Sequence, residues 1–369
     1  MITAPRLRPY TPDPTALQQP LAFDVYTDRG VLWSRMGSTL PAGKRPLGGR
    51  QLFREVAPDD DGDCPPLEAL LEQGRGYERS AGAWGCQAAD ACRVDGIAQE
   101  LILSARSNPA LCSGMAMHMP IQSHAMAHSF AVAANAVSLG IWLDLDDKTL
   151  ATLARAALTM NIASLALHDD CAMWRGPLEA QQRQDIGGHP QLAANLLAQT
   201  PGIDLRWIDT VDQHHENTDG SGYPYGNQRD AIPLEARVLR VADVWCAQLS
   251  PGANRVGAPP RAILGRLFQH ERRRLDDRVL FELRRRFGIY PPGSLVRLMN
   301  RETAVVTAWN EGGAMPKYVV SILTPSGEIE PTPKVRLTAR PKHAIRGHAS
   351  FSANQLRAVP WHQVWAAAA

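Results

Sequence analysis

Helical periodicity over residues 119–287 constrains the fold of this chain more than any other feature. Ala, Leu, Ile and Val recur at helical spacing through six segments, which are 119–143, 148–167, 179–197, 207–215, 234–249 and 262–287. Pro291, Pro292 and Gly293 then end the run, because proline cannot continue a helix. The sequence therefore predicts an all-α domain over residues 115–290.

The segments on either side of this domain predict short β-rich elements. Alternating, β-branched residues after Ser294, Thr303 and Lys317 indicate a small antiparallel sheet over residues 291–340. A hairpin is predicted around Asp28-Arg29-Gly30, within a small N-terminal α+β region over residues 21–114. We expect an irregular, proline-rich arm at 1–20, a loop at 59–66 and a loosely ordered tail at 341–369. The fold class is mainly α, with small β-rich elements at the N- and C-terminal ends.

Composition narrows the classes of function. The 369 residues carry a net charge of +2, which argues against a DNA-binding surface. No stretch of 18 apolar residues predicts a membrane span, and the N-terminus lacks the apolar core of a signal peptide. The six cysteines form no C-x-x-C pair. We therefore expect a cytoplasmic protein with free thiols.

Histidines gather inside the predicted helical domain. Six of the eleven lie between His124 and His215, and the adjacent pair His214-His215 precedes a glycine-rich turn. Asp243 lies in an otherwise apolar helix, where a bare carboxylate is costly unless a cation pairs with it. Imidazole nitrogen and carboxylate oxygen together suit divalent iron, manganese or zinc. Such an ion can polarise a phosphoryl oxygen.

One ordered set of motifs resembles a known family. Residues 214–224, HHENTDGSGYP, resemble the signature loop of the HD-GYP family, whose members are helical, metal-dependent phosphodiesterases that open cyclic di-GMP. Further motifs agree over about 170 residues, namely His128-Ser129, His189-Pro190, residues 232–243 and residues 291–297.

The resemblance implies a site and its ligands. It implies a divalent metal such as iron or manganese, cyclic di-GMP or a related nucleotide as ligand, and a diguanylate-cyclase-type protein as a partner. The implied metal ligands are His128, His189, His214, His215 and Asp243, with His124 as a further candidate. The implied ligand or partner contacts in the loop are Asp219, Gly220, Gly222, Tyr223 and Pro224.

The family's His-Asp dyad has two candidate positions here. The family spaces its histidines by roughly thirty residues on each side of the dyad, and position 160 gives gaps of 32 (160 − 128) and 29 (189 − 160). Position 168 gives 40 (168 − 128) and 21 (189 − 168). We therefore favour Met160-Asn161 as the replaced dyad, with His168-Asp169 as the rival. Eight residues along a continuous helix turn a side chain by about 80° beyond two turns, so we expect His168 to miss the metal-facing direction.

The favoured register predicts a degenerate site. Methionine is a poor ligand for a hard ion, and asparagine cannot bridge two cations as aspartate does. Ser164 stands where the family has lysine, so at most one ion is expected.

Three functions follow from these residues. The first is a module of cyclic di-GMP signalling with reduced or no phosphodiesterase activity, which acts by binding a nucleotide or a protein. The alternative is an active metal-dependent cyclic di-GMP phosphodiesterase. The third is a helical scaffold in which the histidines only fill the core, although the loop over residues 214–224 has no evident packing function at a helix end.

Overall fold

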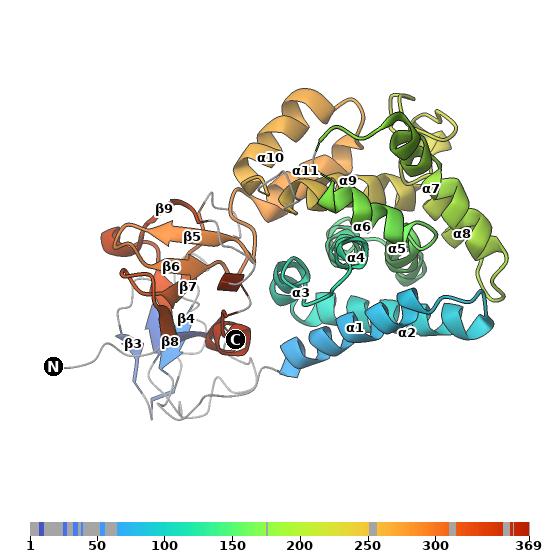
Figure 1. The fold of residues 1–369 in the computed structure, drawn as a ribbon. Helices are drawn as coiled ribbons and strands as arrows, with labels where there is room; N and C mark the ends of the chain where they lie inside the picture. Colours follow the sequence, from blue (N-terminus) through green and yellow to red (C-terminus); the bar gives the residue numbers. More distant parts are fainter. Residues whose placement is uncertain are drawn as a thin grey trace. The chain divides into compact units, whose positions relative to one another are not determined.

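The computed structural model divides the chain into two compact units. It describes residues 7–10, 25–27, 32–35, 38–39, 52–55, 65–174, 176–250, 257–309, 315–349, 355–356 and 358–368. One unit comprises Met1–Leu67 with Tyr290–Ala369, and the other comprises Glu68–Ile289. Figure 1 shows that the first is rich in strands and the second is helical, so we call them the β unit and the helical unit.

The helical unit is a bundle built around one central helix, α4. This helix packs against α2, α3, α5, α6, α9 and α11 (Figure 1), and 14 of its 19 residues are buried. It is long and apolar enough to cross a membrane by composition, but 78% of its apolar window is buried inside the bundle, which fits a core helix. The elements are α1 Pro65–Gly82, α2 Ala88–Ser107, α3 Pro109–Ala116, α4 His124–Trp142, α5 Asp147–Thr159, α6 Leu165–Met173, α7 Ala180–Ala198, α8 Leu205–Asp212, η1 Arg229–Ala231, α9 Leu234–Leu249, α10 Pro260–Arg266, η2 Leu267–Glu271 and α11 Asp277–Phe287.

Side-chain caps fix where several helices begin. Ser123 accepts a hydrogen bond from Met126 N at the start of α4, and Asp146 accepts one from Thr149 N at the start of α5. Asp204 caps α8 in the same way. Such caps satisfy backbone N–H groups that have no partner within the helix.

The predicted continuous helix over residues 148–167 is interrupted, and on this point the prediction was wrong. Helix α5 ends at Thr159 and α6 begins at Leu165. Between them the chain forms turns, in which Ile162 N donates to Thr159 O and Ser164 N donates to Asn161 O. Thr159 is held by tertiary contacts, since its hydroxyl accepts from Trp207 Nε1. Because α6 is a separate helix, the directions of its side chains cannot be calculated by continuing the helical turn of α5.

A five-stranded antiparallel sheet forms the main part of the β unit, as the sequence predicts. Its order is β8-β7-β6-β5-β9. The strands are β5 Leu295–Leu298, β6 Thr303–Val305, β7 Tyr318–Leu323, β8 Ile329–Leu337 and β9 Ile345–His348, and η3 Pro341–His343 precedes β9.

The last 29 residues are not a loosely ordered tail where the structure describes them. Strand β9 pairs with β5, and α13 Trp361–Ala368 packs on the sheet. Val364 of this helix is fully buried in a cluster with Val320 and Ile322. Apolar burial of this kind stabilises the end of a chain that composition alone does not mark as ordered.

The N-terminal predictions also need correction. Within the predicted irregular arm, β1 Leu7–Tyr10 pairs with β4 Leu52–Glu55, in a sheet of order β1-β4-β2-β3. The predicted hairpin is present as β2 Val25–Thr27 and β3 Leu32–Ser34.

The predicted region 21–114 also does not act as one unit. Most of α1, together with α2 and α3, belongs to the helical unit. Residues 59–64 of the loop predicted at 59–66 lie outside the described residues. The last two residues of that prediction, Pro65 and Pro66, begin α1. Proline is tolerated at the start of a helix because the first helical N–H groups have no partner within the helix.

Candidate functional site

The helical unit gathers histidines from several helices at one place. His128 comes from α4, His168 from α6 and His189 from α7. His214 and His215 follow the end of α8. Asp243, on α9, adds the carboxylate. Residues more than 100 positions apart in the chain thus meet in one cluster, which we call the histidine cluster.

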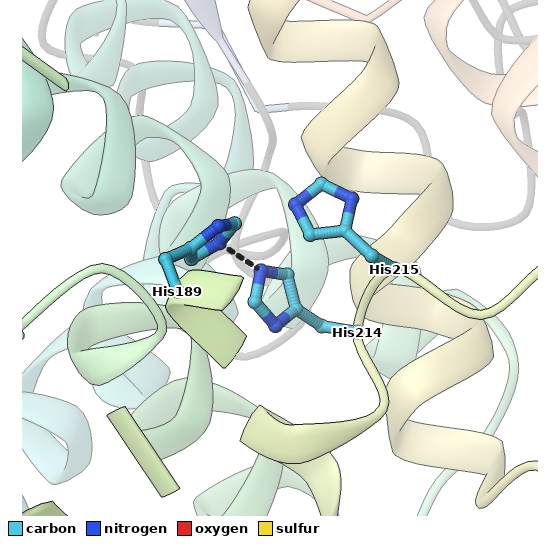
Figure 2. A group of neighbouring side chains, drawn as sticks. All are labelled: His189, His214 and His215. Atoms are coloured by element: carbon cyan, nitrogen blue, oxygen red, sulfur yellow. Dashed lines mark hydrogen bonds between the residues drawn. The ribbon is translucent and has the colours of Figure 1, made fainter. Parts of the chain in front are cut away.

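Three imidazoles form the centre of this cluster. His189 Nε2 lies 3.1 Å from His214 Nε2, and Figure 2 shows these rings with His215 beside them. One ligand atom from each of the three lies within 4.8 Å of the others. His189 and His214 are almost completely buried. The spacing is short enough for several of these nitrogens to bind one ion.

The hydrogen bonds of His189 and His214 determine which of their ring nitrogens face each other. His189 Nδ1 lies 2.5 Å from Ile186 O, and His214 Nδ1 lies 2.5 Å from Val211 O. A carbonyl oxygen only accepts, so both Nδ1 atoms carry the proton and both neutral rings present an Nε2 lone pair. Two lone pairs 3.1 Å apart repel each other unless a proton or a metal ion lies between them.

Burial keeps these rings neutral. Burial first, and then the neighbouring imidazoles, lower the pKa of His189 to about 2, and burial lowers that of His214 to about 4. Burial also holds the pKa of His215 well below its usual value. Neutral imidazole is the form that binds metals, so the cluster is ready to bind an ion at neutral pH.

His168 joins the cluster, contrary to the direction that we expected for its side chain. Its ring centroid lies 4.8 Å from that of His189, edge to face. Its Nδ1 lies 3.0 Å from Ser164 O, and burial lowers its pKa. The expectation assumed one unbroken helix, and the turn between α5 and α6 removes that assumption.

The other residues of the two dyad registers have partners outside the imidazoles. Asn161 is buried and donates from Nδ2 to Ser129 Oγ at 3.2 Å, and Met160 is packed in the core. Asp169 accepts from Ala125 N at 2.8 Å and from Ser123 Oγ at 3.1 Å, so its carboxylate binds the start of α4. The imidazole of His168 therefore lies in the histidine cluster, whereas the carboxylate of Asp169 caps α4.

Asp243 is already paired with two cationic or donating groups. His128 Nε2 lies 2.8 Å from Asp243 Oδ1, and Arg240 Nη1 lies 3.4 Å from Asp243 Oδ2. Burial alone raises the pKa of the Asp243 carboxyl, but the hydrogen bond and charge of His128 and the charge of Arg240 hold it well below its usual range. Asp243 is therefore an anion whose charge is balanced within the protein.

His124 lies apart from this arrangement. It is the first residue of α4 and is exposed to solvent, whereas His128 one turn later is half-buried. The group of three converging ligand atoms in the described residues is His189, His214 and His215. The structure thus brings five of the six predicted metal ligands, counting Asp243, to one place and leaves His124 at the surface.

Comparison with known proteins places this site in a family. Residues 105–279 match the model of the HD domain family, HD_5. The helical unit belongs to the HD-GYP group of HD domains. With the bundle and the histidine cluster, this match confirms the family that residues 214–224 indicate.

The relatives found match this chain over only part of their own length. The chain is 27% identical over 239 residues to the cyclic di-GMP phosphodiesterase PA4108 of Pseudomonas aeruginosa, covering 65% of this chain and 56% of that protein. It is 32% identical over 147 residues to the response regulator RpfG of Xanthomonas campestris, a cyclic di-GMP phosphodiesterase, covering 39% of this chain and 38% of that protein. This chain therefore spans about half the length of these relatives, or less.

A solved structure supports the fold. Bd1817, an HDG"Y"P protein from Bdellovibrio bacteriovorus, superposes with a TM-score of 0.51 at 15% identity, over 75% of this chain and 98% of that one.

The HD-GYP loop, residues 214–224, folds back tightly on itself. A Cβ added at Gly222 would lie 2.2 Å from Asn217 N and 2.5 Å from Glu216 Cα, so only glycine fits there. Glu216 Oε1 accepts from Tyr225 N and Gly226 N, and Asp219 accepts from Ser221. The loop is thus fixed by its own hydrogen bonds.

The loop places one aromatic ring against the histidine cluster. The ring of Tyr223 stacks on His215 with centroids 4.8 Å apart, and burial raises the pKa of Tyr223 to about 12. Gly220 and Pro224 are half-buried, while Asp219 and Tyr225 are exposed. The loop therefore has one side against the cluster and one side in solvent.

Sequence reasoning missed Arg240. Its Nη1 lies 2.9 Å from His215 Nδ1, and its Nε donates to Asn217 Oδ1 at 3.2 Å. The signal was available, because Arg240 precedes Asp243 by three residues on one helix and such residues are neighbours on the helix surface. The cluster thus contains a permanent protein cation.

Proposed function

We propose that this chain is an HD-GYP module of cyclic di-GMP signalling that binds a cyclic dinucleotide or a protein partner in the cytoplasm and has little or no phosphodiesterase activity. One observation carries the proposal: Asp243, the carboxylate of the histidine cluster, is already bonded to His128 and Arg240. In the favoured register, Met160 and Asn161 stand where the family's dyad would supply a second anionic ligand.

A shortage of anionic ligands limits the number of ions. Two divalent ions a few Å apart repel strongly, and a bridging carboxylate normally offsets this repulsion. Asn161 is neutral and bonded to Ser129, and Asp169 caps α4. We infer that the site holds at most one divalent ion. When bound, such an ion would polarise a phosphate oxygen of the nucleotide.

The nucleotide part of the proposal is supported by the relatives. Those from Pseudomonas aeruginosa and Xanthomonas campestris are cyclic di-GMP phosphodiesterases, and a Vibrio cholerae relative, 25% identical over 165 residues, is a 3'3'-cGAMP-specific phosphodiesterase. That match covers 44% of this chain and 35% of the relative. A cyclic dinucleotide is therefore the ligand class that we assign to the cluster and its loop.

The exposed side of the loop supports a protein partner. Asp219 and Tyr225 face solvent while the loop backbone is held in place by Glu216. A fixed loop can bind a partner without first being ordered, which lowers the entropic cost of association. A diguanylate-cyclase-type protein is the partner that the resemblance implies.

A second candidate function is a phosphodiesterase that uses one ion. The lone pairs that converge from His189 and His214 favour it, because they offer a binding position for that ion. It predicts slow turnover that depends on His214.

The experiment separates binding from cleavage. The purified chain is loaded in turn with iron(II), manganese and nickel and mixed with cyclic di-GMP or 3'3'-cGAMP. Binding is followed by calorimetry, and the nucleotide is then recovered and analysed by chromatography. We expect saturable binding with the nucleotide recovered intact. Turnover that His214→Ala abolishes would contradict the proposal and establish the one-ion phosphodiesterase.

A further inference from the structure

We propose that the histidine cluster binds one divalent ion through Nε2 of His168, His189 and His214, and that Arg240 keeps His215 and Asp243 out of its coordination. The inference deepens the proposed function, and it rests on that function only for the existence of a one-ion site. It gives a function to His168, which has none if Met160-Asn161 is the position of the dyad.

Three of the histidines share one hydrogen-bonding pattern. Nδ1 of His168 lies 3.0 Å from Ser164 O, and the Nδ1 atoms of His189 and His214 lie 2.5 Å from Ile186 O and Val211 O. Each Nδ1 must therefore donate, which leaves each Nε2 with its lone pair. A carbonyl partner on the second nitrogen is the usual arrangement of a metal-binding histidine.

His215 shows the opposite pattern. Its Nδ1 lies 2.9 Å from Nη1 of Arg240, and a guanidinium can only donate. Nδ1 of His215 therefore accepts, and the proton of the neutral ring is on Nε2, where it blocks coordination. Distance alone would group His215 with His189 and His214, since their ligand atoms lie within 4.8 Å. The hydrogen bond to Arg240 separates it from them.

The ring of His168 lies beside that of His189. Its ring meets that of His189 at 83° with centroids 4.8 Å apart, and the rings of His189 and His214 meet at 64° with centroids 5.0 Å apart. Imidazoles that bind one ion are separated by similar distances, because each nitrogen lies about 2 Å from the metal.

Arg240 supplies a fixed positive charge in the other half of the cluster. It contacts His215, Asn217 and Asp243, while His128 holds the second oxygen of Asp243. A second divalent ion there would have to displace the guanidinium and compete with its charge. The cluster is thus divided into a metal-binding half and a half whose charges are already balanced.

The donor set indicates which ions would bind. Three neutral imidazoles suit zinc, cobalt and iron(II) better than magnesium or calcium, which prefer oxygen ligands. Three protein ligands also leave coordination positions open to a phosphate oxygen of a cyclic dinucleotide.

The test measures how many cobalt(II) ions bind to each chain. The visible spectrum of cobalt(II) also depends on its ligands. The full chain is stripped with a chelator and titrated with cobalt(II) under calorimetry and absorption. We expect one ion per chain, with affinity lowered at least about 100-fold in His168→Ala and changed less than about 3-fold in His215→Ala. His270→Ala, which removes an exposed histidine on η2, is the matched control and should leave the affinity unchanged. Normal affinity in His168→Ala, or loss of binding in His215→Ala, would overturn the inference.

A second measurement does not depend on the folding of variants. X-ray absorption of the cobalt-loaded wild-type chain should show scattering from three imidazoles and no metal–metal distance. A metal–metal distance of a few Å would overturn the inference. Cyclic di-GMP binding is measured on the same preparations. If the metal pattern is as predicted but no nucleotide binds, the nucleotide part of the proposed function is contradicted and this inference is not. If nucleotide binds but the metal pattern differs, this inference alone is contradicted.

Discussion

At the scale of single residues, the sequence located most of the histidine cluster but not the bonds within it. Spacing from His128 and His189 to the HD-GYP loop identified five residues that the structure brings together. The spacing of Arg240 to Asp243 could be read from the sequence, but the bond from Arg240 to His215 could not, because it depends on how α9 packs beside His215. Residue type predicts which groups can bind, whereas tertiary contacts decide which nitrogen carries the proton.

Gly222 gives a test at this scale. The substitution Gly222→Ala would place a Cβ 2.2 Å from Asn217 N, so the loop must shift or the chain must lose stability. We expect the free energy of unfolding to fall by about 1–3 kcal/mol, as for other overpacked positions. Denaturant unfolding of the variant and the wild type measures this change.

Gly96→Ala is the control for that variant. Gly96 is exposed within α2, and a Cβ there meets nothing within 4 Å. Alanine should stabilise the helix by roughly 0.5–1 kcal/mol. Equal stability of Gly222→Ala and wild type would show that the loop does not need the close approach at this position.

At the scale of elements, the break between α5 and α6 decides what residues 160–169 do. No proline or glycine marks it in the sequence, and the apolar period continues through it, so periodicity alone predicts one helix. The break depends on tertiary contacts, such as the hydrogen bond from Trp207 to Thr159. For this reason the register of the dyad could be argued from spacing, but the direction of His168 could not.

Asp169 tests this account of the element. Its carboxylate accepts from Ala125 N and Ser123 Oγ at the start of α4, so Asp169→Ala should cost about 1 kcal/mol of stability, as the loss of a helix cap does. Metal affinity should change little, because the carboxylate is bonded to the start of α4. Asp170→Ala, at an exposed neighbour, is the control for both measurements. Loss of bound metal in Asp169→Ala alone would instead identify His168-Asp169 as a displaced dyad.

At the scale of the whole molecule, the sequence predicted the fold class better than the limits of the units. The all-α domain was expected from residue 115, but α1, α2 and α3 also belong to the helical unit. Their apolar faces pack within that unit, and a local pattern does not show which core a helix will join. The β unit likewise combines both ends of the chain, as the helix α13 and the strand β1 illustrate.

His343 in the β unit makes the stability of the molecule depend on pH. Burial and then the charge of Arg336 lower its pKa to about 4, although Glu302 opposes this. The unfolded chain takes up a proton at His343 below about pH 6.5, while the folded chain does so only near pH 4. This contribution to stability is therefore complete above pH 6.5 and is lost as the pH falls towards 4.

Denaturant unfolding of wild type and His343→Gln at pH 7.5, 6 and 5 measures this contribution. The difference in unfolding free energy between the two proteins should become smaller, or change sign in favour of the variant, as the pH falls. A difference that stays constant from pH 7.5 to pH 5 would show that His343 takes up its proton equally in the folded and unfolded chains.

The number of metal ions in the histidine cluster tests the central claim most directly. Crystals grown with manganese or cobalt(II) can be measured at the absorption edge of the metal, so that anomalous scattering locates every ion. Our account predicts a single peak, within bonding distance of Nε2 of His168, His189 and His214. Two peaks a few Å apart with the carboxylate of Asp243 or Asp169 between them would contradict it, and would restore a complete two-metal site to this chain.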